Sequence, residues 1–326
     1  MEHETADAQR SIWTRLTGRR EKWKTESARK SARFFVVRLI RWLRKWGARR
    51  RILANSRLPG PAPVPPIWPL PRCAEGPSEE EIRMRFAKPN LWHFDFSFEG
   101  GLQFSSRHAQ PVPYLHREDA LKRFCHFMPW LLQATGGNLE GKRVLDIGCN
   151  SGFWSIQCAL LGAREVVGFD ARRELVDEAS FIREVVGCGN VQFRVLDFWD
   201  MNPETMGGSF DVVLNLGILY HLPDPLEALK RTRQMANGYI ILDTMLVRSE
   251  DSIIRIDWEK PNDINQAATA GIVAWPSRSG VELMLKHIGL SRYLEIPIRT
   301  MEVPSSYAAG DRASWLIDGS RVHIMR

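Results

Sequence analysis

Apolar runs alternate with longer amphipathic stretches along the chain from residue 141 onward. The runs are rich in Val, Ile, Leu and Phe and predict buried strands, at residues 141–149, 165–171, 191–198, 211–217 and 238–244. The stretches between them repeat apolar residues at helical spacing and predict helices at residues 155–163, 174–187 and 224–236. Strands that alternate with helices build a parallel sheet covered on both faces, so the pattern predicts an α/β fold.

The end of the chain continues this pattern. Ser277 precedes a stretch with apolar residues at helical spacing and is predicted to cap a helix through residues 279–289. Strand-like runs follow at residues 294–298 and 312–317.

The first part of the chain has a different character. Residues 27–51 predict a helix, because large apolar side chains recur every three or four residues, namely Phe35, Leu39, Trp42, Leu43 and Trp46. Seven prolines then lie between Pro59 and Pro71, a density that excludes helix and favours an extended linker. We therefore predict three parts: a basic, partly helical arm at 1–57, a linker at 58–71, and a domain at 72–326 with its core at 141–244.

Charge separates the arm from the domain. Residues 1–60 hold 17 Lys and Arg against 5 Asp and Glu, whereas the remainder holds 28 against 33, so the net charge of +7 comes from the arm. Three interpretations of the arm stay open: a solvated extension, a helix at 27–51 lying on an anionic membrane surface, or an RNA contact.

The compartment follows from what the chain contains. No apolar run is long enough to predict a transmembrane helix, and the apolar stretch near the N-terminus is too short and too rich in arginine to predict a signal peptide. The five cysteines are scattered without C-x-x-C spacing, and the histidines lack metal-ligand spacing. We expect a cytoplasmic protein without a metal site, with peripheral membrane contact left open through the arm.

A glycine-containing turn follows the first predicted strand. Asp146, Gly148 and Gly152 give the spacing D-x-G-x-x-x-G, whereas a dinucleotide fingerprint needs glycine at Asn150 and Phe153. Glycine lets the backbone turn sharply and approach a ligand closely, and the N–H groups of the following helix suit a carboxylate. The spacing excludes a dinucleotide and favours S-adenosylmethionine, with Asp146 serving its ammonium group.

Acidic residues also end the next two strands. Asp170, followed by Ala171, is placed to accept hydrogen bonds from ribose hydroxyls, and Asp197 from the adenine amino group, with Phe198 against the ring. Each acid alone is more simply a loop or cap residue. Three of them at one edge of a sheet favour a cofactor site, because ligands bind at that edge.

The fourth strand leads into GILYH at 217–221, and PLEAL follows at 225–229. These segments, with VLDIGCNSGFW and RASWLI, resemble the class I S-adenosylmethionine-dependent methyltransferases, and within them the tRNA wobble-uridine carboxymethyltransferases. The resemblance covers about residues 91–317. It implies a Rossmann-like, mostly parallel seven-stranded sheet and puts cofactor contacts at Gly148, Asp170, Phe198, Leu216 and Tyr220.

The resemblance also bears on the transferred group. It puts Arg312 near that group, but the family's E-W-x-S-D-W-K-W pattern upstream of the first strand is missing, with Trp92 as a partial match. We therefore expect methyl transfer to a small molecule rather than the alternative, tRNA wobble-uridine (carboxy)methyl transfer. A cofactor-binding module without turnover is a third hypothesis.

Three residues are candidates for catalysis. Methyl transfer mainly requires donor and acceptor to be held in line, and Tyr220 is expected to contact one of them. His221 is either a base for the acceptor proton or a residue that holds the following loop. Arg312 binds an anionic acceptor or the cofactor, unless it is only a surface ion-pair partner. Acceptor selectivity is expected in segments 88–130 and 245–276, and the sequence leaves the oligomeric state open.

Overall fold

The computed structural model describes residues 60–87, 94–104, 117–259, 271–299 and 303–320, without the side chains of 117–119. The chain divides into two compact units, residues 1–53 and 54–326, and all described residues belong to the second. Predictions for the basic arm, for Trp92 and for residues 260–270 lie outside these ranges. Within them, no helix has both the length and the apolar composition needed to span a membrane.

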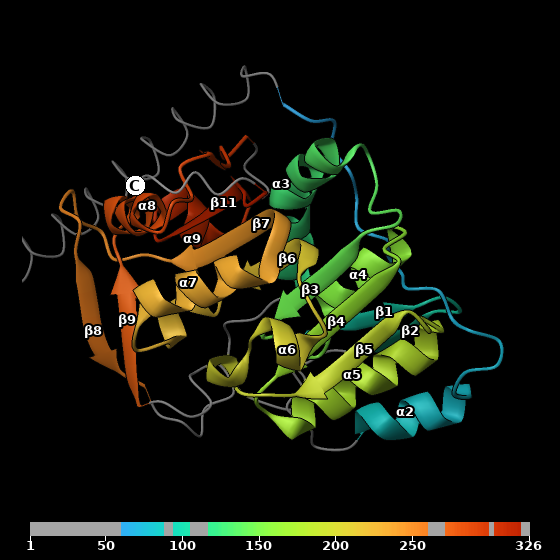
Figure 1. The fold of residues 1–326 in the computed structure, drawn as a ribbon. Coiled ribbons are helices and arrows are strands. Elements are labelled where there is room, and N and C mark those ends of the chain that lie inside the picture. The colour runs from blue at the N-terminus through green and yellow to red at the C-terminus, as the bar shows by residue number, and fades with distance from the viewer. Residues whose placement is uncertain (1–59, 88–93, 105–116, 260–270, 300–302, 321–326) are drawn as a thin grey trace, which may run out of the picture. The chain divides into compact units, whose positions relative to one another are not determined.

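A seven-stranded sheet organises the domain, with strand order β10-β11-β7-β6-β3-β4-β5 (Figure 1). Its central strands are parallel, and β11 and β10 are antiparallel to their neighbours. The strands are β3 Arg143–Ile147, β4 Glu165–Asp170, β5 Val191–Val195, β6 Phe210–Leu216, β7 Ala236–Met245, β10 Tyr293–Glu295 and β11 Arg312–Asp318. The predicted mostly parallel Rossmann-like sheet is confirmed. β10 is shorter than the predicted strand at 294–298, since Pro297 has no N–H for a ladder.

Helices cover both faces of this sheet. Alternate strand residues point to opposite faces, so Val144 and Val166 enter one apolar core while Leu145 and Val167 enter the other. The first face carries α3 Arg117–Thr135, α4 Phe153–Leu160 and α5 Arg173–Val186; the second carries α6 Pro203–Met206, α7 Pro225–Met235 and α8 Arg278–His287. Ser277 caps α8 by accepting the Gly280 N–H at 3.1 Å, as predicted.

Smaller elements complete the fold. Helix α2 Glu79–Ala87 lies beside α5, with the Arg85 guanidinium 5.6 Å from the Phe181 ring (Figure 1). The remaining elements are β1 Phe96–Phe98, β2 Leu102–Phe104, η2 Phe198–Asp200, η3 Leu219–His221, β8 Ile254–Trp258, β9 Ile272–Pro276 and α9 Ser305–Ala309.

The proline-rich segment is extended from residue 60 onward and is bound along the domain. The side-chain amide of Gln157 on α4 accepts the Ile67 N–H at 2.9 Å and donates to the Ile67 carbonyl at 2.9 Å. Leu70 pairs with β1, and Cys73 donates its N–H to Val185 at the end of α5. Gln157 is fully buried. Its amide satisfies both backbone groups of Ile67, as the backbone of a neighbouring strand would.

Gln157→Leu should lower the free energy of unfolding by about 1–3 kcal/mol, because it leaves the Ile67 N–H and C=O without their partner. Urea denaturation measures the change. Gln133→Leu, at an exposed position of α3, is the matched control. Equal stability of the two variants would contradict the role given to the amide.

Candidate functional site

The turn after β3 depends on left-handed backbone. Gly148 has φ +66°, and a Cβ there would lie 3.0 Å from Ile218 Cδ1. Gly152 has φ +83°, and a Cβ there would lie 2.8 Å from the Phe193 ring. Asn150 also has a positive φ of 52°, a conformation that asparagine tolerates. Because Gly152 gives α4 no side-chain cap, the first N–H groups of this helix are available to an anion.

Asp146, the next-to-last residue of β3, lies beside this turn and is fully buried. Its Oδ2 accepts the Ser155 hydroxyl at 2.6 Å, whereas its Oδ1 has no hydrogen-bond partner among the described residues. Burial raises the pKa of Asp146 to about 7, although the bond from Ser155 lowers it. A buried carboxylate oxygen without a donor fits the ammonium group of a bound S-adenosylmethionine.

Asp170 ends β4 beside the same turn. Its two oxygens accept the backbone N–H groups of Asn150 at 3.1 Å and Arg172 at 3.0 Å. Each oxygen keeps a lone pair for a further donor, as ribose recognition requires. Burial raises the pKa of Asp170, against these two hydrogen bonds, which lower it. Ala171, half-buried, lies between the carboxylate and Arg172.

The residues after β5 have structural contacts of their own. The Asp197 carboxylate accepts the Trp199 N–H at 2.9 Å and caps η2. Phe198 is only 4% exposed and packs into the core between the sheet and the α6–α7 face. The cap is the simpler of the two roles weighed for Asp197, and its contact with adenine stays a prediction, as does that of Phe198.

A buried ionic cluster lies at the ends of β6, β7 and β11. Asp243 on β7 is fully buried and accepts Arg123 Nη2 at 2.7 Å and Arg312 Nε at 2.7 Å. It also accepts the hydroxyls of Ser314 and Tyr307. Burial alone would raise the pKa of Asp243, but the two guanidinium groups and these hydroxyls hold it well below its usual range.

This cluster carries more positive than negative charge. Two arginines face one carboxylate, and both approach Gly217, where a Cβ would lie 2.8 Å from Arg312 Nη2 and 3.8 Å from Arg123 Nη2. The side chains of both are largely buried, at 12% and 13% exposed. The neutral His126 adds no charge, since burial lowers its pKa to about 4. Within the cluster, Asp243 therefore balances only one of the two guanidinium groups, and Glu259, bound to His221, is the second carboxylate that acts on Tyr220.

Tyr220 lies under this charge, with Arg312 Cζ 6.0 Å from its ring centre. Burial raises the pKa of Tyr220, although Arg312 and Arg123 lower it. The phenol is therefore protonated at neutral pH and is a hydrogen-bond donor. Leu216, which ends β6, is half-buried just before Gly217.

His221 contacts Glu259, which follows β8 in the antiparallel pair of β8 and β9. Its Nδ1 lies 2.7 Å from Glu259 Oε2, directly after β8. With the proton on Nδ1, the bond leaves Nε2 as the ring acceptor. This contact supports both roles weighed for His221, because it ties η3 to the hairpin and sets the tautomer that a base requires.

Sequence reasoning missed four residues of this site: Arg123, Asp243, Glu259 and Tyr307. Asp243 had a usable signal, since it ends a predicted strand as Asp146 and Asp170 do. Arg123 and Glu259 had none, because their proximity to the site comes from tertiary packing alone.

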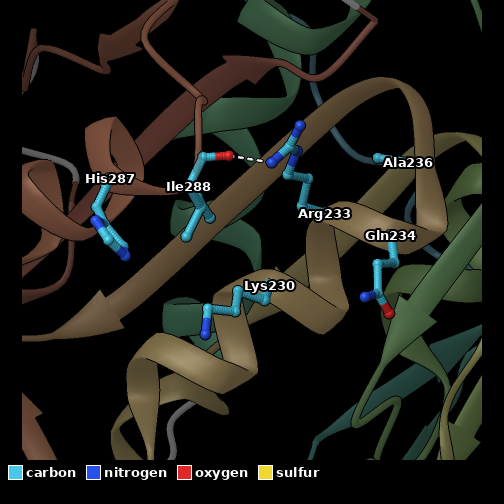
Figure 2. Close-up of a pocket in the computed structure, with 6 residues that line it drawn as sticks. All are labelled: Lys230, Arg233, Gln234, Ala236, His287 and Ile288. Atoms are coloured by element: carbon cyan, nitrogen blue, oxygen red, sulfur yellow. Dashed lines mark hydrogen bonds between the residues drawn. The ribbon is translucent and has the colours of Figure 1, made fainter. Parts of the chain in front are cut away.

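A cavity of about 520 Å³ lies elsewhere and does not belong to this site (Figure 2). Arg233 near the end of α7 donates to the Ile288 carbonyl, and Ala236 begins β7. The cavity is therefore at the amino end of β7, opposite the edge where α/β sheets bind their ligands. Its lining residues are Lys230, Arg233, Gln234, Ala236, His287 and Ile288.

Comparison with known proteins adds the chemistry that this geometry fits. Residues 115–293 match the family described as methyltransferase domain. A tRNA U34 carboxymethyltransferase of Helicobacter hepaticus is 35% identical over 134 residues, which are 39% of this chain and 42% of that protein. One from Pseudomonas fluorescens is 27% identical over 177 residues, 53% of this chain and 54% of that protein. The chain thus spans about half or less of the length of these relatives.

A solved structure agrees on the fold. The N-terminal domain of EvdMO1, crystallised in the presence of SAH and D-fucose, has a TM-score of 0.57 and 22% sequence identity. The match covers 76% of this chain and 99% of that domain. This likeness concerns the fold alone.

Cofactor affinity should rise with pH through the titration of Asp146. The ammonium group binds the carboxylate form, so a carboxyl with a pKa of about 7 must lose its proton before binding. The association constant should rise about tenfold per pH unit between pH 5.5 and 6.5 and level off above pH 7.5. Calorimetric titration measures this slope. Asp146→Asn should bind the cofactor weakly and show no such pH dependence. If its association constant rose with pH in the same way, the titrating group would be another residue.

Asp170→Ala should weaken S-adenosylmethionine binding by about 100-fold or more, because two charge-assisted hydrogen bonds are lost. Asp177→Ala, at an exposed position of α5, is the control, and circular dichroism checks that both variants fold. Undiminished affinity in a folded Asp170→Ala protein would remove Asp170 from the cofactor site.

Proposed function

Since this chain belongs to the methyltransferase-domain family and its cofactor is S-adenosylmethionine, we propose that it alkylates the wobble uridine of tRNA from a carboxylated form of that cofactor. Bound, such a cofactor supplies a sulfonium-linked carbon that an acceptor attacks in line, with a thioether leaving. The protein has mainly to hold the two reactants together and to receive the acceptor's proton.

The excess positive charge beside Gly217 carries this proposal. A buried guanidinium without an anion is costly, and Asp243 neutralises one of Arg123 and Arg312 but not both. A carboxylate on the transferred group would satisfy the remaining charge, and the protonated Tyr220 could donate to it. The carboxylate belongs to the donor before transfer and to the product after it, so this charge would hold the transferred group in position throughout the reaction.

A cation from another element supports the proposal even though the upstream pattern is missing. That pattern supplies cationic and aromatic residues before the first strand in the family that the chain resembles. Here Arg123, on α3 before β3, brings a cation to the same cluster, 2.7 Å from Asp243. The loss of the pattern therefore does not remove the charge that a carboxylated donor needs.

His221, oriented by Glu259, is placed to accept the proton that the acceptor must lose. Glu259 orients the imidazole through Nδ1 at 2.7 Å, which leaves Nε2 free to accept a proton during transfer. The choice of tRNA as acceptor is supported by the names of the curated relatives, which are 35% and 34% identical to this chain over 134 and 143 residues.

Methyl transfer to a small molecule, the expectation from the sequence, is the second candidate. The absent E-W-x-S-D-W-K-W pattern favours it. In that case the excess charge of the cluster would bind an anionic group of the acceptor, and plain S-adenosylmethionine would be the donor.

Paired calorimetric titrations separate the two candidates. With the carboxylated donor, affinity should exceed that for S-adenosylmethionine at least tenfold, and Arg123→Met should remove this preference while leaving S-adenosylmethionine binding within about threefold. Arg312 and Asp243 then remain as a neutral pair, and circular dichroism checks that the variant folds. Arg183→Met, on the surface of α5, is the control.

The acceptor is tested on the same proteins. Incubation with the preferred donor and unmodified tRNA, followed by mass spectrometry of the nucleosides, should show a new modified uridine. The proposal would be overturned if both donors bound with equal affinity and the tRNA remained unmodified. That result would favour the small-molecule candidate.

A further inference from the structure

The hairpin of β8 and β9 lies apart from the central sheet (Figure 1). Large apolar side chains of this hairpin are exposed to solvent. Ile254, Ile256 and Trp258 alternate along β8 and are 44%, 69% and 70% exposed, and Ile272 opposite Trp258 is 48% exposed. Surface residues of this size are ordinary when scattered, but a contiguous row of them marks an interaction surface.

The outer edge of β8 also has backbone groups available for pairing. Glu259 donates its N–H to the Gly271 carbonyl at 2.9 Å, so every second residue from there, Asp257 and Arg255, directs its backbone towards β9. Ile256 and its alternate neighbours therefore direct their N–H and C=O groups away from β9. In the part of the chain that the structure describes, β8 pairs with β9 and with no other strand.

The sequence of this edge is complementary to itself. An antiparallel copy of Ile254–Trp258, with its two-fold axis at Ile256, places Arg255 opposite Asp257 of the other copy and Ile254 opposite Trp258. Opposite charges then meet on one face and large apolar side chains on the other, both of which stabilise cross-strand pairs. Arg255 and Asp257 are half exposed, with a 2.9 Å ion pair between them, and can exchange this bond for the one across the axis.

We propose that two copies of this chain associate through β8 as a symmetric dimer, which joins the hairpins into one four-stranded sheet. The Trp258 N–H, which donates to the Asp257 side chain at 2.9 Å, then donates to the Ile254 carbonyl across the axis. An unprotected apolar edge strand invites unwanted pairing, and closed two-fold pairing removes that edge. The inference is independent of the proposed acceptor.

The dimer would also support the candidate site. Trp275 on β9 packs edge-on against Tyr220 with ring centres 5.4 Å apart, and Glu259 binds His221. In the four-stranded sheet of the dimer, the hairpin would hold Trp275 against Tyr220 and Glu259 against His221. Dimer formation would thereby also stabilise η3.

Sedimentation of the full chain over a range of concentrations tests the interface. Arg255→Glu and Asp257→Arg should each weaken association at least tenfold, since each places like charges opposite one another. An equimolar mixture of the two variants should recover it as a heterodimer. In that pair the introduced glutamate lies opposite the introduced arginine, and the native Asp257 of one copy lies opposite the native Arg255 of the other. Failure to recover in the mixture would contradict the antiparallel register.

Backbone pairing is tested at the axis. Ile256→Pro removes an N–H that points away from β9, which an edge strand tolerates, and should abolish the dimer while cofactor binding persists. Ile256→Val is the matched control and should dimerise. A wild-type monomer at about 100 µM, within the range where exposed apolar edges associate, would overturn the proposal, as would a dimer that survives Ile256→Pro. Binding of a monomer to phosphatidylcholine vesicles, lost in Trp258→Ala, would assign the face to lipid and also overturn it.

Discussion

The buried carboxylate of Asp243 is the interaction on which the geometry of the candidate site depends. It joins α3, β7, α9 and β11 through Arg123, Tyr307 and Arg312. A fully buried charge persists only when it is paired and hydrogen-bonded, so these elements are held in one arrangement. The same requirement brings two guanidinium groups to the end of β6. The ion pairs that hold these elements together therefore also place two positive charges where the cofactor's reactive group is expected.

The two halves of the site meet different physical demands. The half around Asp146 and Asp170 consists of acceptors: carboxylates at the ends of β3 and β4 and a turn whose left-handed residues keep the backbone close to the ligand. The half around Gly217 consists of donors: Arg123, Arg312 and a protonated Tyr220. A cationic sulfonium donor with a polar tail and an anionic transferred group would place each of its charges against an opposite one.

The residues proposed for the first half could be selected from the sequence because their signals are local. Runs of buried apolar residues form β3 and β4, an acid lies at or next to the end of each, and the glycine spacing indicates the turn, so Asp146, Gly148 and Asp170 could be proposed from the local sequence. The fold was predicted for the same reason, since each strand and helix has its own apolar period. The resemblance to the wobble-uridine enzymes then located Tyr220 and Arg312, which no local pattern marks.

The rest of the site depends on contacts between distant segments. Arg123 is 120 residues from Asp243, and Glu259 is 38 residues from His221; an amphipathic helix and an exposed hairpin give no sign of either partner. The proline-rich segment is similar: its composition predicts extended backbone, but the buried Gln157 that binds it on α4 is visible only in the fold. These ion pairs and amide hydrogen bonds form only when distant segments pack together. The sequence pattern of a single segment therefore does not predict them.

The ionic cluster also sets an order of assembly. The cofactor turn needs only β3 to β6, which are contiguous in the chain and adjacent in the sheet. Arg312 belongs to the last strand, 69 residues after Asp243, and that strand inserts antiparallel beside β7. A ribosome therefore releases the donor-binding turn well before the cationic pair can form. The strands of the glycine turn are therefore present in the nascent chain before Arg312, the second cation of the cluster, has been added.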